Sequence, residues 1–137
     1  MVAGAVGTLA LDATTYLDIA LRGRAPSTTP EQQVEAVEHE LGLELGKHRR
    51  TGTAALMGYA LGVTGGLAYG LLGGRRRIPV LVAGLGLGGA VMVASAASMT
   101  LSGVTDPREW GVEGWLADVV PHAVYGVVTA AVFERYS

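Results

Sequence analysis

The charged residues of this 137-residue chain are gathered into short clusters, and the long stretches between them carry few charges. Only 16% of the residues are Asp, Glu, Lys or Arg, whereas a soluble domain usually contains about 25%. Four of the stretches approach the roughly 20 helical residues needed to cross a bilayer core. They cover residues 2–21, 51–73, 78–101 and 116–133. We predict one all-α transmembrane domain over residues 1–137, an integral membrane four-helix bundle. A soluble helical bundle is the alternative.

The first connection between the predicted spans is long enough for a helix of its own, over about residues 30–46. Thr29 followed by Pro30, with Gln32 three positions after Thr29, matches a capped helix start. One face of this helix is apolar and the opposite face is acidic: Val34, Val37, Leu41 and Leu45 against Glu31, Glu35, Glu38 and Glu44. Because an acidic face does not suit anionic lipid headgroups, we expect this amphipathic helix to cap the bundle or to contact a partner.

Small residues recur every four positions along the second and third predicted spans. The two stripes are Gly58, Gly62, Gly66 and Gly70 on the second span, and Gly86, Ala90, Ala94 and Ser98 on the third, with Gly84 and Gly88 on an adjacent row. In lipid, small residues let helix backbones approach closely. The connection after Gly73 has room only for a tight hairpin, so we predict that these spans are antiparallel neighbours packed at short distance. Self-association of copies through the same stripes is the alternative.

The first and fourth predicted spans carry the polar groups. The candidate buried polar site consists of Asp12, His122, Tyr16, Tyr125, Thr8, Tyr69 and Asp118. An ionised carboxylate in hydrocarbon is costly, so Asp12 should be paired, be protonated, or face protein or water. Asp12 and His122 either form a proton-titratable or cation-coordinating site, or serve as polar contacts that align the helices. Pro121, beside His122, predicts a bend or a late start of the fourth helix.

Other function classes lack support in the sequence. The absence of cysteine excludes disulfides and thiolate chemistry. His39 and His48 do not have the spacing of a metal site, and we predict no metal and no cofactor. The net charge of −2, with no aromatic residues beside the basic run at 75–77, argues against a nucleic-acid partner. No serine lies in a glycine elbow, which argues against a serine hydrolase. A membrane enzyme that uses a carboxylate and a histidine for acid–base chemistry is a third hypothesis, but nothing else in the chain specifies a substrate, so we predict that the chain is not an enzyme.

Three short motifs resemble those of a known family when they are read in order. They are Gly-Thr-Leu-Ala-Leu-Asp at 7–12, Gly-Gly-Leu-Ala-Tyr-Gly at 65–70 and His-Ala-Val-Tyr-Gly at 122–126. In this order they resemble the YagU-like family of small bacterial inner-membrane proteins, whose molecular function is not established. The third predicted span lacks the tryptophan, and the proline after it, that the family leads us to expect. The resemblance implies a multi-pass protein of the bacterial inner membrane with a buried aspartate, and it implies no substrate.

These observations favour a small polytopic membrane protein with a structural or accessory role. Its expected partners are the lipid bilayer and either further copies of the chain or other subunits of a membrane complex. The alternative is a proton- or cation-linked transport or channel element that uses Asp12 and His122.

Overall fold

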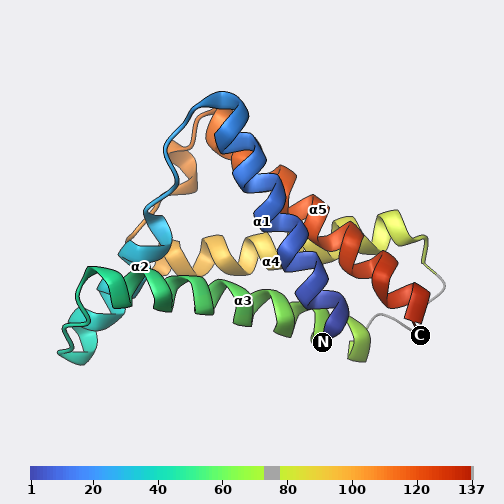
Figure 1. Ribbon diagram of the computed structural model, residues 1–137, viewed down its shortest axis with the longest axis horizontal. Coiled ribbons are helices and arrows are strands. Elements are labelled where there is room, and N and C mark those ends of the chain that lie inside the picture. Colours follow the sequence, from blue (N-terminus) through green and yellow to red (C-terminus); the bar gives the residue numbers. More distant parts are fainter. Residues whose placement is uncertain (73–77, 137) are drawn as a thin grey trace.

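The computed structural model describes residues 1–72 and 78–136, and this part of the chain is built from helices without a strand (Figure 1). The helices are α1 (Val2–Arg22), α2 (Thr29–Leu41), α3 (Lys47–Leu72), α4 (Val80–Leu101) and α5 (Val112–Tyr136), with a 3-10 turn at Pro107–Glu109. The all-α prediction is therefore confirmed. The predicted hairpin at 73–77 lies outside the described residues.

Three of the described helices, α3, α4 and α5, are long and apolar enough to cross a membrane. Helix α1 closely matches the bounds of the first predicted span but is not one of the three. It carries Asp12 and Asp18 among its apolar residues, and these carboxylates make it a weaker candidate. The structure is thus compatible with a membrane protein that has three candidate spans, while the fourth span remains a prediction.

Several helix boundaries differ from the predicted ones for local reasons. Helix α2 ends at Leu41, a turn earlier than expected, because Gly42 adopts a left-handed conformation with a φ of 64°. Thr28, not Thr29, is its N-cap, and no side chain caps it. Helix α5 begins at Val112 and continues through Pro121, so the expected late start at this proline is wrong.

Helix α5 is the central element of the fold. It packs most extensively against α4 and α1, and α1 packs in turn against α3 (Figure 1). The α4–α5 crossing is antiparallel and brings backbones together: a Cβ atom on Gly84 would lie 2.8 Å from the Val127 nitrogen and 2.9 Å from the Gly126 carbonyl oxygen. Such close approach is available only to glycine at these positions.

The predicted close pairing of the second and third spans is wrong. These spans are α3 and α4, and they share far fewer contacts with each other than α5 shares with either α1 or α4. An apolar groove of about 490 Å³ lies between them, lined by residues of both helices. The physical reason is that Gly62, Gly66 and Gly70 of α3 face α1 and α5, while the glycines of α4 that make contact face α5.

The residues of the two predicted stripes accordingly have different environments. Gly62 and Gly66 lie against Thr8 and Gly4 of α1, and Gly70 lies against the Phe133 ring. Gly58 and Gly86 have nothing within 4 Å of an added Cβ, so they are not packing positions among the described residues. On α4, Ala90 and Ala94 line the groove and Ser98 accepts a hydrogen bond from Gln33 of α2. The packing row of α4 is therefore Gly84 and Gly88, one row away from the predicted stripe.

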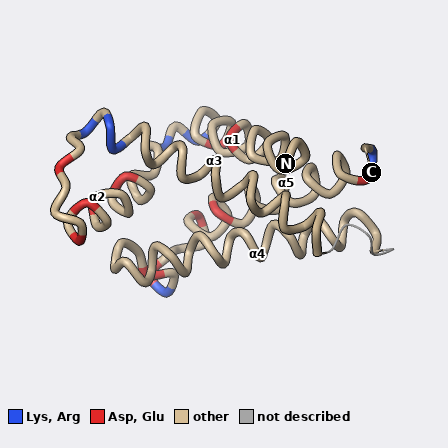
Figure 2. The backbone as a smooth tube through the Cα atoms, turned by 90° about the horizontal axis from the view of Figure 1, so that it is seen from below, with Lys and Arg blue, Asp and Glu red and all other residues tan. Residues whose placement is uncertain are grey.

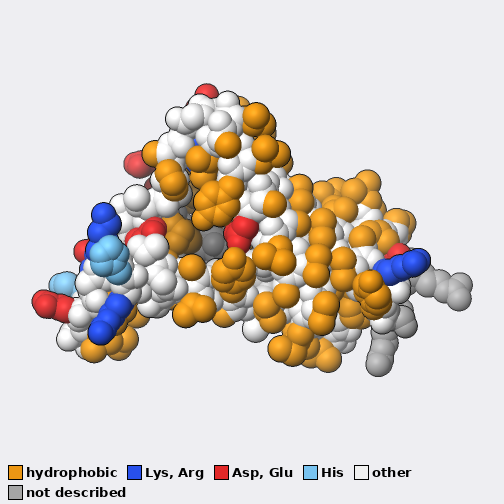
Figure 3. Space-filling model, viewed as in Figure 1, with side chains coloured by type: hydrophobic (Ala, Val, Ile, Leu, Met, Phe, Trp, Pro, Cys, Tyr) orange, Lys and Arg blue, Asp and Glu red, His pale blue; other side chains and the backbone are white. Residues whose placement is uncertain are grey.

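The outer surface of the helices is largely apolar. Hydrophobic side chains cover much of the face shown in Figure 3, over α1, α3 and α5. Many large side chains in the candidate spans are exposed, among them Leu56, Leu81 and Val93. Lysine and arginine gather towards helix ends and connections, leaving long uncharged stretches on α3 and α4 (Figure 2). A surface of this kind is suited to lipid or to other apolar helices.

Helix α2 is attached to the start of α3 by a buried carboxylate. Glu38 is only 4% exposed, accepts a hydrogen bond from the Leu45 backbone N–H, and pairs with Arg50, with 2.6 Å between Nε and Oε2. Glu38, predicted on the acidic face of this helix, is thus buried, whereas Leu41, predicted on the opposite apolar face, is 65% exposed. The Leu45 N–H, and the Arg50 side chain after it, hold the pKa of Glu38 below its usual value of 4.5.

The paired glycines of α4 provide a test of the α4–α5 crossing. Gly88→Ala should destabilise the fold by about 1–3 kcal/mol, because the new methyl group would collide with the His122 carbonyl group. Gly89→Ala is the matched control: its Cβ meets nothing within 4 Å, so its stability should be unchanged or slightly higher. The stability of each variant would be measured as the midpoint of its unfolding when dodecyl sulfate is titrated into the detergent solution. Equal midpoints for the two variants would contradict this crossing.

The Glu38 contacts predict a pH-dependent attachment of α2. Since the folded-state pKa of Glu38 is lowered, its stabilisation is complete above the usual value of 4.5 and is lost as pH falls through the lowered value. Spin labels on cysteines at Gln32 and Ala55 should give a narrow distance distribution from pH 8 to 5 that broadens only below about 4.5. In Glu38→Gln the distribution should not change with pH. Broadening between pH 7 and 5 would contradict this assignment.

Candidate functional site

Tyr125 lies at the point where three helices meet. Its side chain, on α5, is fully buried, and its hydroxyl donates a 2.6 Å hydrogen bond to the Gly62 carbonyl oxygen of α3. On the α1 side, a Cβ on Gly7 would lie 3.0 Å from the Tyr125 ring. Glycine at 62 and 7 lets both backbones reach the tyrosine. The hydrogen bond to Gly62 and the ring contact at Gly7 hold α1, α3 and α5 in register, and we call them together the Tyr125 pin.

Two hydroxyl groups lie close to this pin. Thr8 donates a 2.9 Å hydrogen bond to the Gly4 carbonyl oxygen of its own helix and packs against Gly62. Thr129 is fully buried beside Tyr125, yet its Oγ1 has no hydrogen-bond partner of good geometry among the described residues. An unsatisfied buried hydroxyl is unfavourable by itself, so the packing at this point outweighs that cost.

His122 is paired with Asp118 and not with Asp12. Its Nδ1 lies 2.8 Å from the Asp118 carbonyl oxygen and 3.3 Å from the Asp118 Oδ1, one helical turn earlier on α5. This geometry fits an Nδ1–H that donates to both oxygens, which leaves Nε2 as the second polar atom of the ring. The side chain is 13% exposed. The pair is therefore local to α5.

Asp12 has a different partner, on α3. The Tyr59 hydroxyl is near enough to interact with the Asp12 carboxylate as a hydrogen-bond donor, and Tyr16 lies nearby. Asp12 is one turn beyond Thr8 along α1, and Tyr59 is almost one turn before Gly62 on α3, as two antiparallel helices require. Within the described part of the chain, no lysine, arginine or histidine forms an ion pair with Asp12.

The predicted polar site is thus divided among separate groups. Tyr125 and Thr8 belong to the buried pin, Asp118 and His122 form a pair within α5, and Asp12 and Tyr16 lie near Tyr59. Tyr69 is elsewhere: its ring packs edge-on against Phe133, with centroids 5.5 Å apart, and lines the apolar groove. Tyr59 was not among the predicted residues, because no sequence signal shows which face of α3 meets α1.

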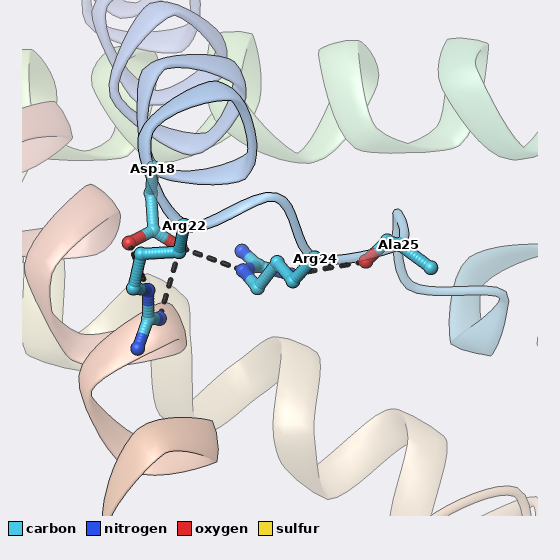
Figure 4. A network of polar contacts seen from close by, with 4 residues as sticks. All are labelled: Asp18, Arg22, Arg24 and Ala25. Carbon is cyan, nitrogen blue, oxygen red and sulfur yellow. Dashed lines mark hydrogen bonds and ion pairs between the residues drawn. The ribbon is translucent and has the colours of Figure 1, made fainter.

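A charged network closes the end of α1. Figure 4 shows the Asp18 carboxylate between Arg22 and Arg24, with Nε to oxygen distances of 2.7 Å to each. The Arg24 guanidinium also donates to the Ala25 carbonyl oxygen at 3.4 Å. The carboxylate is thereby neutralised at the helix end. Because these side chains are partly exposed, their pairing contributes little stability.

Neither Asp12 nor His122 lines either of two cavities found on the surface of the described residues. One is the apolar groove between α3 and α4. The other, about 580 Å³, lies in the connection from α4 to α5 and is lined by Thr100, Gly103, Val104, Thr105, Asp106, Glu109 and Trp110. In that connection the Trp110 indole donates to Thr105 at 2.8 Å and packs edge-on against Trp115.

The described residues offer no cluster of three or more His, Cys, Asp or Glu side chains that could hold a metal ion. Asp118 and His122 would supply two ligands, fewer than the three or four of usual protein zinc sites. The polar groups can therefore donate and accept hydrogen bonds and exchange protons.

Comparisons with protein-family models, with curated proteins and with solved structures find no match to this chain.

The pin at Tyr125 predicts a measurable stability loss. Tyr125→Phe keeps the buried ring and removes only the hydroxyl, so the fold should lose about 0.5–1.5 kcal/mol. Tyr136→Phe, at a side chain 84% exposed, is the control and should be neutral. Dodecyl sulfate unfolding midpoints would compare the two. A Tyr125→Phe protein as stable as the control would mean that the hydroxyl does not stabilise the junction.

Proposed function

We propose that this chain is a multi-pass membrane protein with a structural or accessory role, and that its apolar helix faces contact other helices in a membrane complex. The observation that carries the proposal is the poor mutual packing of α3 and α4. Both are span-length helices, they leave an apolar groove between them, and large side chains such as Leu56 and Leu81 are exposed along them. Apolar faces without a partner in the chain fit contact with lipid and with other subunits.

The proposal takes α1 as the fourth span and the bacterial inner membrane as the location. Helix α1 has 21 residues, about 31 Å at 1.5 Å per residue, and lies against α3 and α5, both of span length. The resemblance to the YagU-like family supports the inner membrane.

The transport alternative depended on Asp12 and His122 acting as a pair. In the described chain Asp12 interacts with Tyr59 and His122 with Asp118. Each group has its own local partner, which favours a structural use of both over a shared proton or cation site.

Two measurements test the proposal. The expressed chain should stay with membranes after an alkaline carbonate wash, because its spans are held by lipid. A photo-crosslinking amino acid at Leu56, 70% exposed, should join the chain to other polypeptides of discrete mass, whereas the same group at the fully buried Ala130 should give only intramolecular products. Release by carbonate would refute the membrane assignment. A carbonate-resistant chain that crosslinks only to lipid at every exposed position would refute the accessory role.

A further inference from the structure

The middle of α3 is only partly covered within the described chain, and we call residues 55–61 its uncovered segment. Ala54 and Gly62 are buried, but each of the seven residues between them, 55–61, is exposed. Seven residues make almost two helical turns, so every face of the helix is represented. Helix α2 covers the start of α3, α1 and α5 pack closely against α3 from Gly62 onwards, and before Gly62 the Asp12 side chain of α1 reaches Tyr59. Gly58, in this uncovered segment, has open space beside its backbone.

Asp12 of α1 lies at the edge of this uncovered segment, level with the midpoint of α3. It interacts with Tyr59, which is the thirteenth of the 26 residues of α3. Both nearby side chains, Tyr59 and Tyr16, are neutral and exposed, at 41% and 66%. In hydrocarbon a carboxylate without a cationic partner is costly, and such groups are usually paired with another helix.

We propose that the surface formed by Asp12, Tyr16, Gly58 and Tyr59 is the docking site for a membrane helix of a partner protein that carries an arginine or lysine at the depth of Asp12. This inference rests on the proposed accessory role and names the partner chemistry. Charge complementarity selects the cation, and Gly58 allows a second backbone to approach α3 closely. Arginine suits the position best, because its planar fork binds a carboxylate through two hydrogen bonds.

A second copy of this chain does not meet the requirement. Among the described residues, its lysines and arginines lie at helix ends or in the connections between helices: Arg22, Arg24, Lys47, Arg49, Arg50, Arg108 and Arg135. The basic run at 75–77 follows α3 in the sequence and lies outside the described residues. An aligned copy would therefore place no permanent cation beside Asp12. His122 is the one imidazole within the apolar part of a span, and it is mostly covered and held by Asp118. The cation must come from a different polypeptide.

The test uses a synthetic helix of defined sequence as the partner. The full chain, labelled on a cysteine at the exposed Glu40, is reconstituted in phosphatidylcholine vesicles with a labelled Leu/Ala helix of about 24 residues that has arginine at its centre. The same helix with leucine at its centre is the control probe. Energy transfer should show about tenfold tighter binding of the arginine helix. Asp12→Asn should remove most of this preference, and Asp12→Glu should retain it.

Two more variants show whether a loss of binding comes from blocking the docking surface, from a less stable fold or from a change in net charge. Gly58→Leu fills open space and should leave the dodecyl sulfate unfolding midpoint unchanged, yet weaken binding of the arginine helix about tenfold by blocking the surface. Glu109→Gln removes an exposed acid in the α4–α5 connection and should not affect binding.

Three results would overturn the inference. They are equal binding of the arginine and leucine helices, an arginine preference that survives both Asp12→Asn and Gly58→Leu, and probe-free self-association of the chain that Gly58→Leu abolishes. A chain that resists carbonate and crosslinks to other polypeptides, but shows no arginine preference, would retain the accessory role and reject only this partner chemistry.

Discussion

The close approach of backbones around Tyr125 is the constraint on which the rest of the structure depends. The tyrosine hydroxyl reaches the Gly62 carbonyl oxygen of α3, and the α1 backbone passes the ring at Gly7. Larger residues at either glycine would separate the helices by more than the hydrogen bond can span. Because α5 joins α1 and α3 here and crosses α4 at Gly84 and Gly88, the contacts of one helix set the positions of three others.

A consequence of this arrangement is that α3 and α4 are held by other helices and only weakly by each other. Their apolar groove and the uncovered middle of α3 follow from the way α1 and α5 lie across them. In water, such exposure of large apolar side chains would favour aggregation. In a bilayer the same side chains contact acyl chains at little cost, so packing and hydrogen bonds decide which helices associate.

Three of the ionisable side chains described above are satisfied by groups that lie close to them along the chain. His122 turns to Asp118 one helical turn away, Glu38 is held by Leu45 and Arg50, and Asp18 is held by two arginines at the end of α1. These are contacts within one helix or between neighbouring segments of the chain. Asp12 is the exception, because its neighbour Tyr59 is neutral and belongs to another helix, and it lies where the surface is open.

Helix content and helix bounds were largely readable from the sequence. Long apolar stretches ended by glycine, proline and charge predicted the helices to within a few residues, because hydropathy and end signals act locally along the chain. The face of α2 was predicted less well: Glu38 is buried because Arg50, a residue of another helix, neutralises it. Local patterns do not contain that information.

The pairing of the helices could be decided only by the tertiary structure. Rows of small residues indicated surfaces that another helix can approach closely, but a glycine allows close approach by any helix and does not select one. Hence the sequence did not distinguish α4 from α1 as the neighbour of Gly62 and Gly66, nor one row of α4 from the next. The partners of Asp12 and His122 were undetermined for the same reason. The sequence alone specified apolar helices with isolated polar groups, whereas the choice among helix partners depended on three-dimensional packing around Tyr125.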